Sequence, residues 1–363
     1  MAYTDIDDPS AYFQTALYTG NAGTQTITND GNSDLQPDFL WFKERSVSGN
    51  HQLINTVSGI NKKLMSNSTS GEATQTNYVT AIGSDSFSIG NNNGLNQNSV
   101  TNVCWQWKAG TSFSNDASST SVGSLDSAGS VSTDAGFSII SYTGAGDGQA
   151  SSTQTVAHGL GVVPQVLIVK NLADSTNWFV YHHKNTSAPA TDVLYLNLNN
   201  ATGDDNGPWN DVAPTSSVFT VGGDNGTNGN GDGMIAYCFA EKQGYSKFGS
   251  YIGNGSASSG TFTYLGFKPS LIILKRTDST ADWKMYDNKR NSGSITNGNP
   301  NGRTLKPNSS AAEGNAELLD FLSNGFKHYN DNGTDNESGA TYIFMAFAEN
   351  PLVTSTGVPA TAR

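Results

Sequence analysis

One phrase occurs three times along the chain, and it limits the fold more than any other feature of the sequence. In each copy a proline opens a run of Val, Leu, Ile, Phe or Trp, and a lysine closes the run. Such a run between a Pro/Gly turn and a polar loop predicts a strand. The copies lie at 36–43, 155–170 and 268–275, with prolines at Pro37, Pro164 and Pro269. Recurrence at domain-sized spacing predicts duplicated domains rather than one large active site.

Three further phrases repeat around the proline phrase in the same order. A Tyr-Thr-Gly or Tyr-Ile-Gly phrase precedes it, a short strand built around a Phe comes later, and an aromatic strand closes each copy. The early phrase lies at 17–21, 141–145 and 250–254, the Phe phrase at 86–89, 218–221 and 325–327, and the closing strand at 103–108, 236–242 and 343–349. Four phrases kept in register predict three repeats.

Short strands with frequent turn signals predict an all-β protein made of three tandem antiparallel β-sandwich repeats. Jelly-roll and lectin-like sandwiches both fit the pattern. The one helix candidate is 311–322. The predicted organisation is an N-terminal arm 1–10, repeat 1 at 11–110, a Ser-rich linker or loosely held edge strand at 111–135, repeat 2 at 136–243, repeat 3 at 244–350 and a C-terminal tail 351–363.

Composition narrows the function classes. Charged residues are 14% of the chain, well below the usual share of about 25%. The formal charge is −12, which argues against nucleic acid, whose phosphates need Lys and Arg. Apolar runs are too short for a membrane span of about 18 residues, so we expect no membrane insertion. The first ten residues carry no basic or apolar run, so we expect synthesis in a cytoplasm without a secretory signal.

Motifs for catalysis are missing from the sequence. It contains no Gly-x-Ser-x-Gly, no His-Glu-x-x-His and no phosphate-binding Gly-rich loop. Glu241 and Glu349 recur at one position of two repeats, whereas a glycosidase needs two carboxylates facing each other within about 5–9 Å. The neighbours His182 and His183 would face opposite sides of a strand. We therefore expect no enzyme, no catalytic residue, no metal centre and no cofactor.

Loops rich in Asp, Asn and Gly are the candidates for binding. Asp331 and Asp335 lie in one of them and form a candidate Ca²⁺ loop, although Asn-Gly and Asp-Gly also suit tight turns. Trp209 lies in a polar loop without a counterpart in the other repeats, which suggests an exposed aromatic contact for a receptor or glycan. Asn210, Asp224 and Asp232 are the polar residues expected to share that contact surface.

Four residues are expected in the core. Trp178 and Trp283 recur after the proline strand and are predicted to be equivalent buried residues. Cys104 and Cys238 occupy matching positions in the closing strands of two repeats. Equivalent positions in separate domains lie too far apart for a disulfide, so both are expected to be small buried residues.

The repeated phrases resemble a β module of marine bacteriophage virion proteins. The phrases are Tyr-Thr-Gly-Asn at 18–21, Val-Ala-His-Gly-Leu-Gly-Val-Val-Pro at 156–164 and Ala-Tyr-Cys-Phe-Ala-Glu at 236–241. The resemblance covers about 11–350, is densest over 136–350 and carries no catalytic or binding residues. It implies a structural component of a virion, made in the cytoplasm of a host bacterium, with other virion proteins and the host cell surface, carbohydrate or protein, as partners.

We therefore expect a non-enzymatic virion protein, first of all a tail fibre or receptor-binding appendage. A capsid decoration protein and a depolymerase of surface polysaccharide are the alternatives. Phage appendages are commonly trimers, so a homotrimer is one expected assembly, and three domains in one chain forming a pseudo-threefold body is the other.

Overall fold

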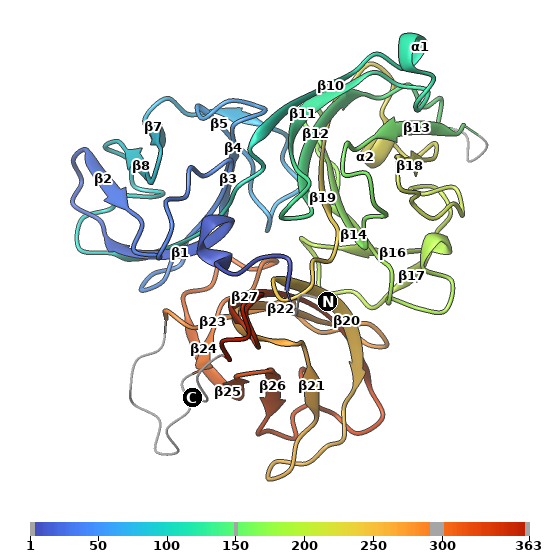
Figure 1. The fold of residues 1–363 in the computed structure, drawn as a ribbon. Coiled ribbons are helices and arrows are strands. Elements are labelled where there is room, and N and C mark those ends of the chain that lie inside the picture. Colours follow the sequence, from blue (N-terminus) through green and yellow to red (C-terminus); the bar gives the residue numbers. More distant parts are fainter. Residues whose placement is uncertain (1–3, 149–151, 291–300, 360–363) are drawn as a thin grey trace.

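The computed structural model describes residues 4–148, 152–290 and 301–359, and these form an all-β protein (Figure 1). Strands take 42% of the residues and helices 4%. The helices are single turns at polar, turn-forming sequences, because short polar side chains compete with helical hydrogen bonds. They are η1 (Pro9–Ala11), α1 (Ala117–Thr120), η2 (Pro189–Thr191) and α2 (Asn225–Asn228).

One strand order recurs in three sheets, which we call the inner sheets. The strand that ends in the Tyr-x-Gly phrase pairs with the closing aromatic strand. The closing strand also pairs with the proline strand, which in turn pairs with the strand after it. The ladders are antiparallel. Unit 1 has β1 (Phe13–Thr19), β9 (Thr101–Trp107), β3 (Phe39–Glu44) and β4 (Gln52–Asn55); unit 2 has β12 (Phe137–Thr143), β19 (Gly233–Phe239), β14 (Val166–Asn171) and β15 (Phe179–His182); unit 3 has β20 (Ser246–Ile252), β27 (Thr341–Pro351), β22 (Phe267–Arg276) and β23 (Lys284–Asp287).

A smaller outer sheet accompanies each inner sheet. The outer strands of unit 1 are β2 (Gln25–Thr28), β8 (Ser86–Ile89) and β7 (Val79–Gly83); those of unit 2 are β13 (Gln154–Ala157) and β18 (Val218–Val221); those of unit 3 are β21 (Phe262–Tyr264), β26 (Gly325–His328), β25 (Gly314–Leu322) and β24 (Asn301–Thr304). Short ladders join β5 (Lys62–Lys63) to β6 (Ala73–Thr74), and β16 (Asp192–Tyr195) to β17 (Gly203–Asp204). In each unit, buried side chains of both sheets share one hydrophobic cluster.

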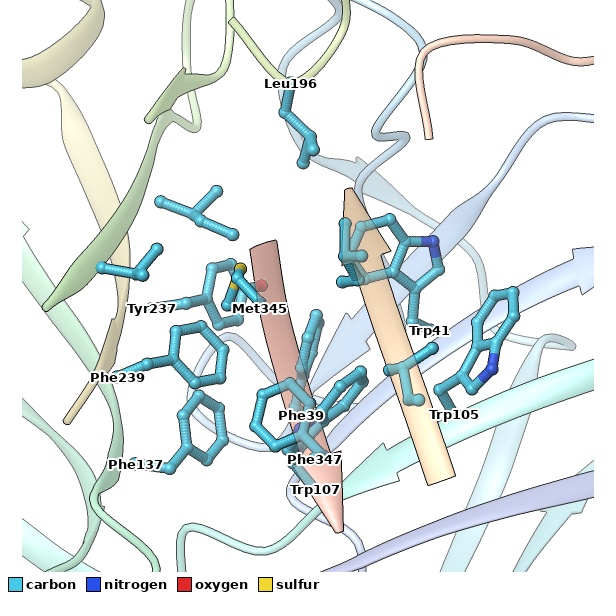
Figure 2. Packing of buried hydrophobic residues seen from close by; sticks show 14 of the residues in the cluster. Phe39, Trp41, Trp105, Trp107, Phe137, Leu196, Tyr237, Phe239, Met345 and Phe347 are labelled. Atoms are coloured by element: carbon cyan, nitrogen blue, oxygen red, sulfur yellow. The ribbon is translucent and has the colours of Figure 1, made fainter. Parts of the chain in front are cut away.

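A fourth cluster lies between the units and joins all three. Side chains along each inner strand point alternately to the two faces of the sheet. One face of each inner sheet packs on its own outer sheet, and the other face packs on the centre of the molecule. Figure 2 shows this centre, where Phe39 and Trp107 of unit 1, Tyr237 and Phe239 of unit 2 and Phe347 of unit 3 meet. Trp178 and Trp283 are buried in the same cluster, which confirms their predicted core position.

Equivalent backbone hydrogen bonds close the three units into a ring. In each case the residue just after the proline strand of one unit offers its carbonyl to an amide of a neighbouring unit. The donor and acceptor pairs are Glu72 and Leu172 at 2.8 Å, Thr202 and Thr277 at 2.9 Å, and Glu313 and Arg45 at 2.8 Å. Unit 1 therefore bonds to unit 2, unit 2 to unit 3 and unit 3 back to unit 1, so Figure 1 shows three lobes around one centre.

The segment 111–135, expected as a Ser-rich linker or a loosely held edge strand, forms paired strands at the edge of a sheet. β10 (Thr111–Asn115) and β11 (Ser127–Ser132) extend the inner sheet of unit 2 beyond β12, and α1 lies between them. Small Ser, Gly and Ala residues suit this position because Gly129 approaches Ile139 so closely that a Cβ would lie 1.8 Å from its carbonyl oxygen. Because these strands are paired in the sheet, unit 1 does not sit apart on a flexible tether.

The prediction of a helix at 311–322 is wrong, because Gly314–Leu322 is strand β25. Leu319 and Phe321 of this strand are buried against unit 3's inner sheet. Helix-forming residues here adopt a strand because the neighbouring strands offer a ladder and an apolar face.

The two terminal segments pack on the body. Ile6 of the predicted N-terminal arm is buried in the central cluster, and the Thr4 hydroxyl donates to the carbonyl of Gln243. In the predicted C-terminal tail, the amide of Ser355 donates to the Asp7 carboxylate at 2.6 Å. No helix in the described residues is long and apolar enough to cross a membrane.

Candidate functional site

Trp209, the predicted exposed contact residue, is buried. Only 1% of its surface is accessible, and its ring lies edge-on to Tyr181 at 6.1 Å between ring centroids. A buried indole cannot stack on a ligand, so its predicted contact role is wrong. Asn210 beside it takes a left-handed backbone conformation, φ 49°, and its side-chain amide donates to the Thr153 hydroxyl at 2.7 Å. This loop is held by internal packing.

Asp224 and Asp232 hold the loop around α2. The Asp224 carboxylate caps α2 by accepting from the amide of Gly226 at 2.6 Å, and burial raises the pKa of Asp224. Asp232 accepts from the side-chain amide of Asn171 at 2.8 Å. Both carboxylates are half-buried and serve local structure.

The two aspartates of the candidate Ca²⁺ loop lie in different environments. Asp331 is exposed, whereas Asp335 is 1% exposed and contacts the ammonium of Lys284 at 2.8 Å. The hydroxyl of Tyr286 donates to the other oxygen of Asp335 at 2.6 Å. Within the described ranges no group of three or more His, Cys, Asp or Glu side chains is arranged to hold a metal ion. The Asp335 carboxylate is therefore engaged by protein groups.

An exposed aromatic face lies on the outer sheet of unit 3. On β21, Phe262 is 44% exposed and Tyr264 is 53% exposed, while Thr263 between them points into the core. In the same register position as Phe262, β2 of unit 1 carries Thr26 and β13 of unit 2 carries Thr155. The fold therefore accepts a small polar residue there, and unit 3 has a large aromatic one. We call Phe262 and Tyr264 the aromatic face.

Lysines accompany the aromatic face. Lys327 lies directly opposite Phe262 on β26, and its Nζ is 5.0 Å from the ring centroid of Tyr329. The Nζ of Lys247 lies 5.4 Å from the centroid of Tyr264 and donates to the Tyr264 carbonyl at 3.0 Å. A cation over an aromatic ring holds the ring in place and brings positive charge to this part of an acidic chain.

A groove of about 440 Å³ adjoins the aromatic face and shares Tyr264 and Lys247 with it. Lys242 and Glu241 form part of one wall, and Leu352 is on the C-terminal segment at another. One oxygen of Glu241 accepts from the amide of Phe248 at 2.7 Å. The groove thus presents an aromatic ring, two lysines and one carboxylate already committed to a backbone amide.

Glu241 and Glu349, the two recurring glutamates, lie in separate hollows. Glu241 lines the groove beside Tyr264, whereas Glu349 lines a hollow of about 170 Å³ near Ser270. The Glu349 carboxylate lies 3.1 Å from the ammonium of Lys268. Each carboxylate has its own local partner, and the structure does not bring them together as a pair.

Sequence reasoning missed the aromatic face. The repeats do carry a usable signal, because Phe262 and Tyr264 occupy positions where Thr26, Thr28 and Thr155 stand in the other units. Reading that signal requires the register of β21 against β26, which the weak similarity of the outer strands does not give. Trp209 was predicted to be exposed because it lies in a polar loop. The composition of a loop does not show whether its aromatic residue is exposed or buried.

The fold defines an all-β protein whose three units share one core, with its exposed aromatic face and groove on the third unit. The chain belongs to the family of the domain of unknown function DUF7483, whose profile matches residues 8–351. The match spans all three units and thus treats them as one domain. No curated protein matches the chain in sequence.

Proposed function

We propose that the chain is a non-enzymatic structural protein of a phage virion, a tail fibre or other receptor-binding appendage, built of three tandem β-sandwich units. The resemblance of its repeated phrases to virion modules supports the setting. The inner and outer sheets of each unit, with a shared cluster between them, support the sandwich assignment. A ring of three such units gives a stiff body with polar loops at its periphery.

The observation that carries the receptor-binding role is the aromatic face with its adjoining groove. Large apolar side chains exposed together on a soluble surface mark interaction sites. The equivalents of Phe262 and Tyr264 are Thr26 and Thr28 in unit 1 and Thr155 and Ala157 in unit 2, so large exposed aromatic residues are not a requirement of the fold.

The chemistry of this surface fits a carbohydrate of the host cell surface, with acidic sugars favoured. An aromatic ring packs on the C–H face of a sugar, and its polar rim leaves the hydroxyls to hydrogen-bond. Lys242 and Lys247 offer positive charge in a chain whose formal charge is −12. An oligosaccharide with carboxylate groups would gain from both features.

Binding of the fluorescently labelled chain to host cells tests the proposal. We expect Tyr264→Ala and Phe262→Ala each to weaken binding at least tenfold, while the folded state persists because both side chains are exposed. Val163→Ser is the matched control, since Val163 is 44% exposed in unit 2 and should bind as the parent does.

Treatment of the host cells identifies the receptor class. Periodate oxidation of surface sugars should abolish binding, and protease treatment should leave it. The opposite pattern would replace the carbohydrate with a protein receptor, and unchanged binding by both aromatic variants would remove this face from the receptor site.

Copy number per particle distinguishes a capsid decoration protein from an appendage. An appendage is present in a few to tens of copies per particle, whereas a decoration protein is present in hundreds. Mass-spectrometric counting of this chain against the major capsid protein in purified particles decides, and hundreds of copies would replace the appendage proposal.

A further inference from the structure

A buried cluster of polar side chains lies inside unit 3, away from the groove. Lys284 is 3% exposed and Asp335 is 1% exposed, and the Lys284 Nζ lies 2.8 Å from Asp335 Oδ1. The same Nζ donates to the Thr334 hydroxyl at 2.6 Å. His328 is fully buried beside them, and neither of its ring nitrogens has a hydrogen-bond partner among the described residues.

The other two units show that the fold does not need this cluster. Lys284 follows the buried residue Trp283, and the residues at the same register position are Gln52 in unit 1 and Phe179 in unit 2. Asp335 precedes Asn336, whose equivalents Asn96 and Asn228 follow Leu95 and Thr227. His328 stands where β8 and β18 end in Ile89 and Val221.

A buried ion pair is therefore present in unit 3 where its sister units have an amide, apolar side chains or a hydroxyl. Burying two opposite charges costs several kcal/mol of desolvation for each ion, and hydrophobic residues often stabilise such a position as well or better. The retention of a close amine and carboxyl in an apolar cluster calls for a reason other than packing.

We propose that Lys284 and Asp335 condense into an intramolecular amide. The step begins with transfer of a proton from the Lys284 ammonium to the Asp335 carboxylate, which gives a neutral amine and a carboxylic acid. The amine nitrogen then attacks Cγ of Asp335. A C–N bond forms, one Cγ–O bond breaks, and the leaving hydroxyl departs with one amine proton as water. No oxidant, reductant or further reactant is needed.

Neighbouring groups are placed to assist this step. The Tyr286 hydroxyl donates to Asp335 Oδ2 at 2.6 Å, so it polarises the carboxyl group and stabilises charge on the oxygen that leaves. The Tyr251 hydroxyl donates to the backbone carbonyl of Asp335 at 2.7 Å and fixes the loop. His328 packs against Tyr251 with 5.0 Å between ring centroids, and burial lowers its pKa to about 4, so it is a neutral base.

The amide would join β23 to the loop that precedes β27. These two strands flank β22 in the inner sheet of unit 3, so the crosslink would tie the sheet across its central strand. It would also prevent unit 3 from extending fully when pulled. This inference stands on the buried cluster and is independent of the proposed receptor role.

Peptide mapping by mass spectrometry tests the proposal on the intact, natively folded chain. We expect the peptides containing Lys284 and Asp335 to appear as one branched species, lighter than their sum by one water. Lys170 and Lys275 are internal controls, because both are buried but their Nζ atoms donate to backbone carbonyls, and their peptides should remain linear.

Variants separate the bond from its surroundings. Lys284→Arg and Asp335→Ala should yield only linear peptides, whereas Tyr286→Phe should form the same branched species several-fold more slowly after refolding. Linear peptides for both residues in the folded parent protein would overturn the proposal. So would a water loss confined to a linear Asp335 peptide, which marks a cyclic imide instead of the crosslink.

Discussion

At the scale of single residues, the centre of this protein is held by polar atoms placed among aromatic rings. The indole of Trp178 donates to the carbonyl of Met65 in unit 1, and the indole of Trp283 donates to the carbonyl of Tyr195 in unit 2, both at 2.9 Å. His51 occupies the equivalent position in unit 1, and its ring accepts from the Trp41 indole of the same unit at 2.9 Å. The indoles of Trp178 and Trp283 therefore bond across unit boundaries.

Truncation of Trp283 tests this residue-scale interpretation. We expect Trp283→Ala to lower the free energy of unfolding by about 3–5 kcal/mol, because it leaves a cavity and an unpaired carbonyl. Trp283→Phe should cost less, since it keeps part of the ring. Urea denaturation followed by tryptophan fluorescence and circular dichroism gives both values. An unchanged midpoint for Trp283→Ala would remove this residue from the core.

Buried histidines predict acid lability. Burial lowers the pKa of His182 to about 3 and that of His328 to about 4, so both stay neutral in the folded chain. Unfolded histidines take up protons below about pH 6.5, so the unfolded state binds more protons and stability falls as the pH is lowered from 6.5 towards 4.

The expected loss is on the order of 1 kcal/mol per pH unit for each such histidine. Thermal unfolding across this pH range measures it. His328→Ile, which introduces the residue that unit 1 has at this position, should flatten the slope, and an equally steep slope in that variant would contradict the assignment.

At the scale of elements, each proline strand has a buried lysine as its next-to-last residue. Lys43, Lys170 and Lys275 donate to the backbone carbonyls of Glu44, Asn171 and Ala281. Burial lowers the pKa of each lysine to about 8. Lys170 and Lys275 also reach carbonyls in the loops after their strands, at Asp174 and Ala281, whereas Lys43 bonds to Glu44 at the end of its own strand.

Strands β10 and β11 give an element-scale prediction for limited proteolysis. Both are paired in the sheet of unit 2, whereas most residues of the tip between them, 116–126, are exposed. We expect a nick in this tip to leave the fragments associated, because the inner sheets on both sides share the central cluster. Size-exclusion chromatography of the nicked protein should show one species of unchanged size. Separation of an N-terminal fragment would show instead that unit 1 is joined to the other units only by a flexible segment.

At the scale of the whole molecule, the three units form a closed ring around one core. Side chains at the ends of the fourth inner strands repeat the direction of the backbone ring. Asn55 donates to the Tyr237 hydroxyl, His182 contacts the carbonyl of Phe344, and Asp287 accepts from the Trp105 indole. Each unit bonds to the next, so the removal of any one exposes the aromatic core of the other two.

Truncation therefore tests the single-core architecture. We expect residues 111–363 expressed alone to form no compact monomer, because they keep β10 and β11 of unit 2's sheet but lack the aromatic side chains of unit 1 that complete the central cluster. The full chain should unfold in one transition, with equal calorimetric and van't Hoff enthalpies. A soluble, cooperatively folded 111–363 fragment would show that units 2 and 3 do not depend on unit 1.

The sequence by itself determined the all-β class, the recurrence of the proline strand and the burial of Trp178 and Trp283. These follow from local alternation and from phrases long enough to recognise in each copy. It could not determine that the three inner sheets pack on one another through the faces that point away from their own outer sheets. A nearly unbroken apolar run such as 166–169 fits a strand covered on both faces, but it does not say which element covers the second face.

Only the tertiary structure decided the fate of the candidate site. Trp209 and Phe262 are both aromatic residues in polar surroundings along the chain, and burial of one and exposure of the other depend on contacts with distant strands. The Lys284–Asp335 pair likewise joins residues far apart in sequence. Local pattern fixes which face of a strand is apolar, whereas the partner of that face depends on chain-wide packing, and both the shared core and the buried pair are products of that packing.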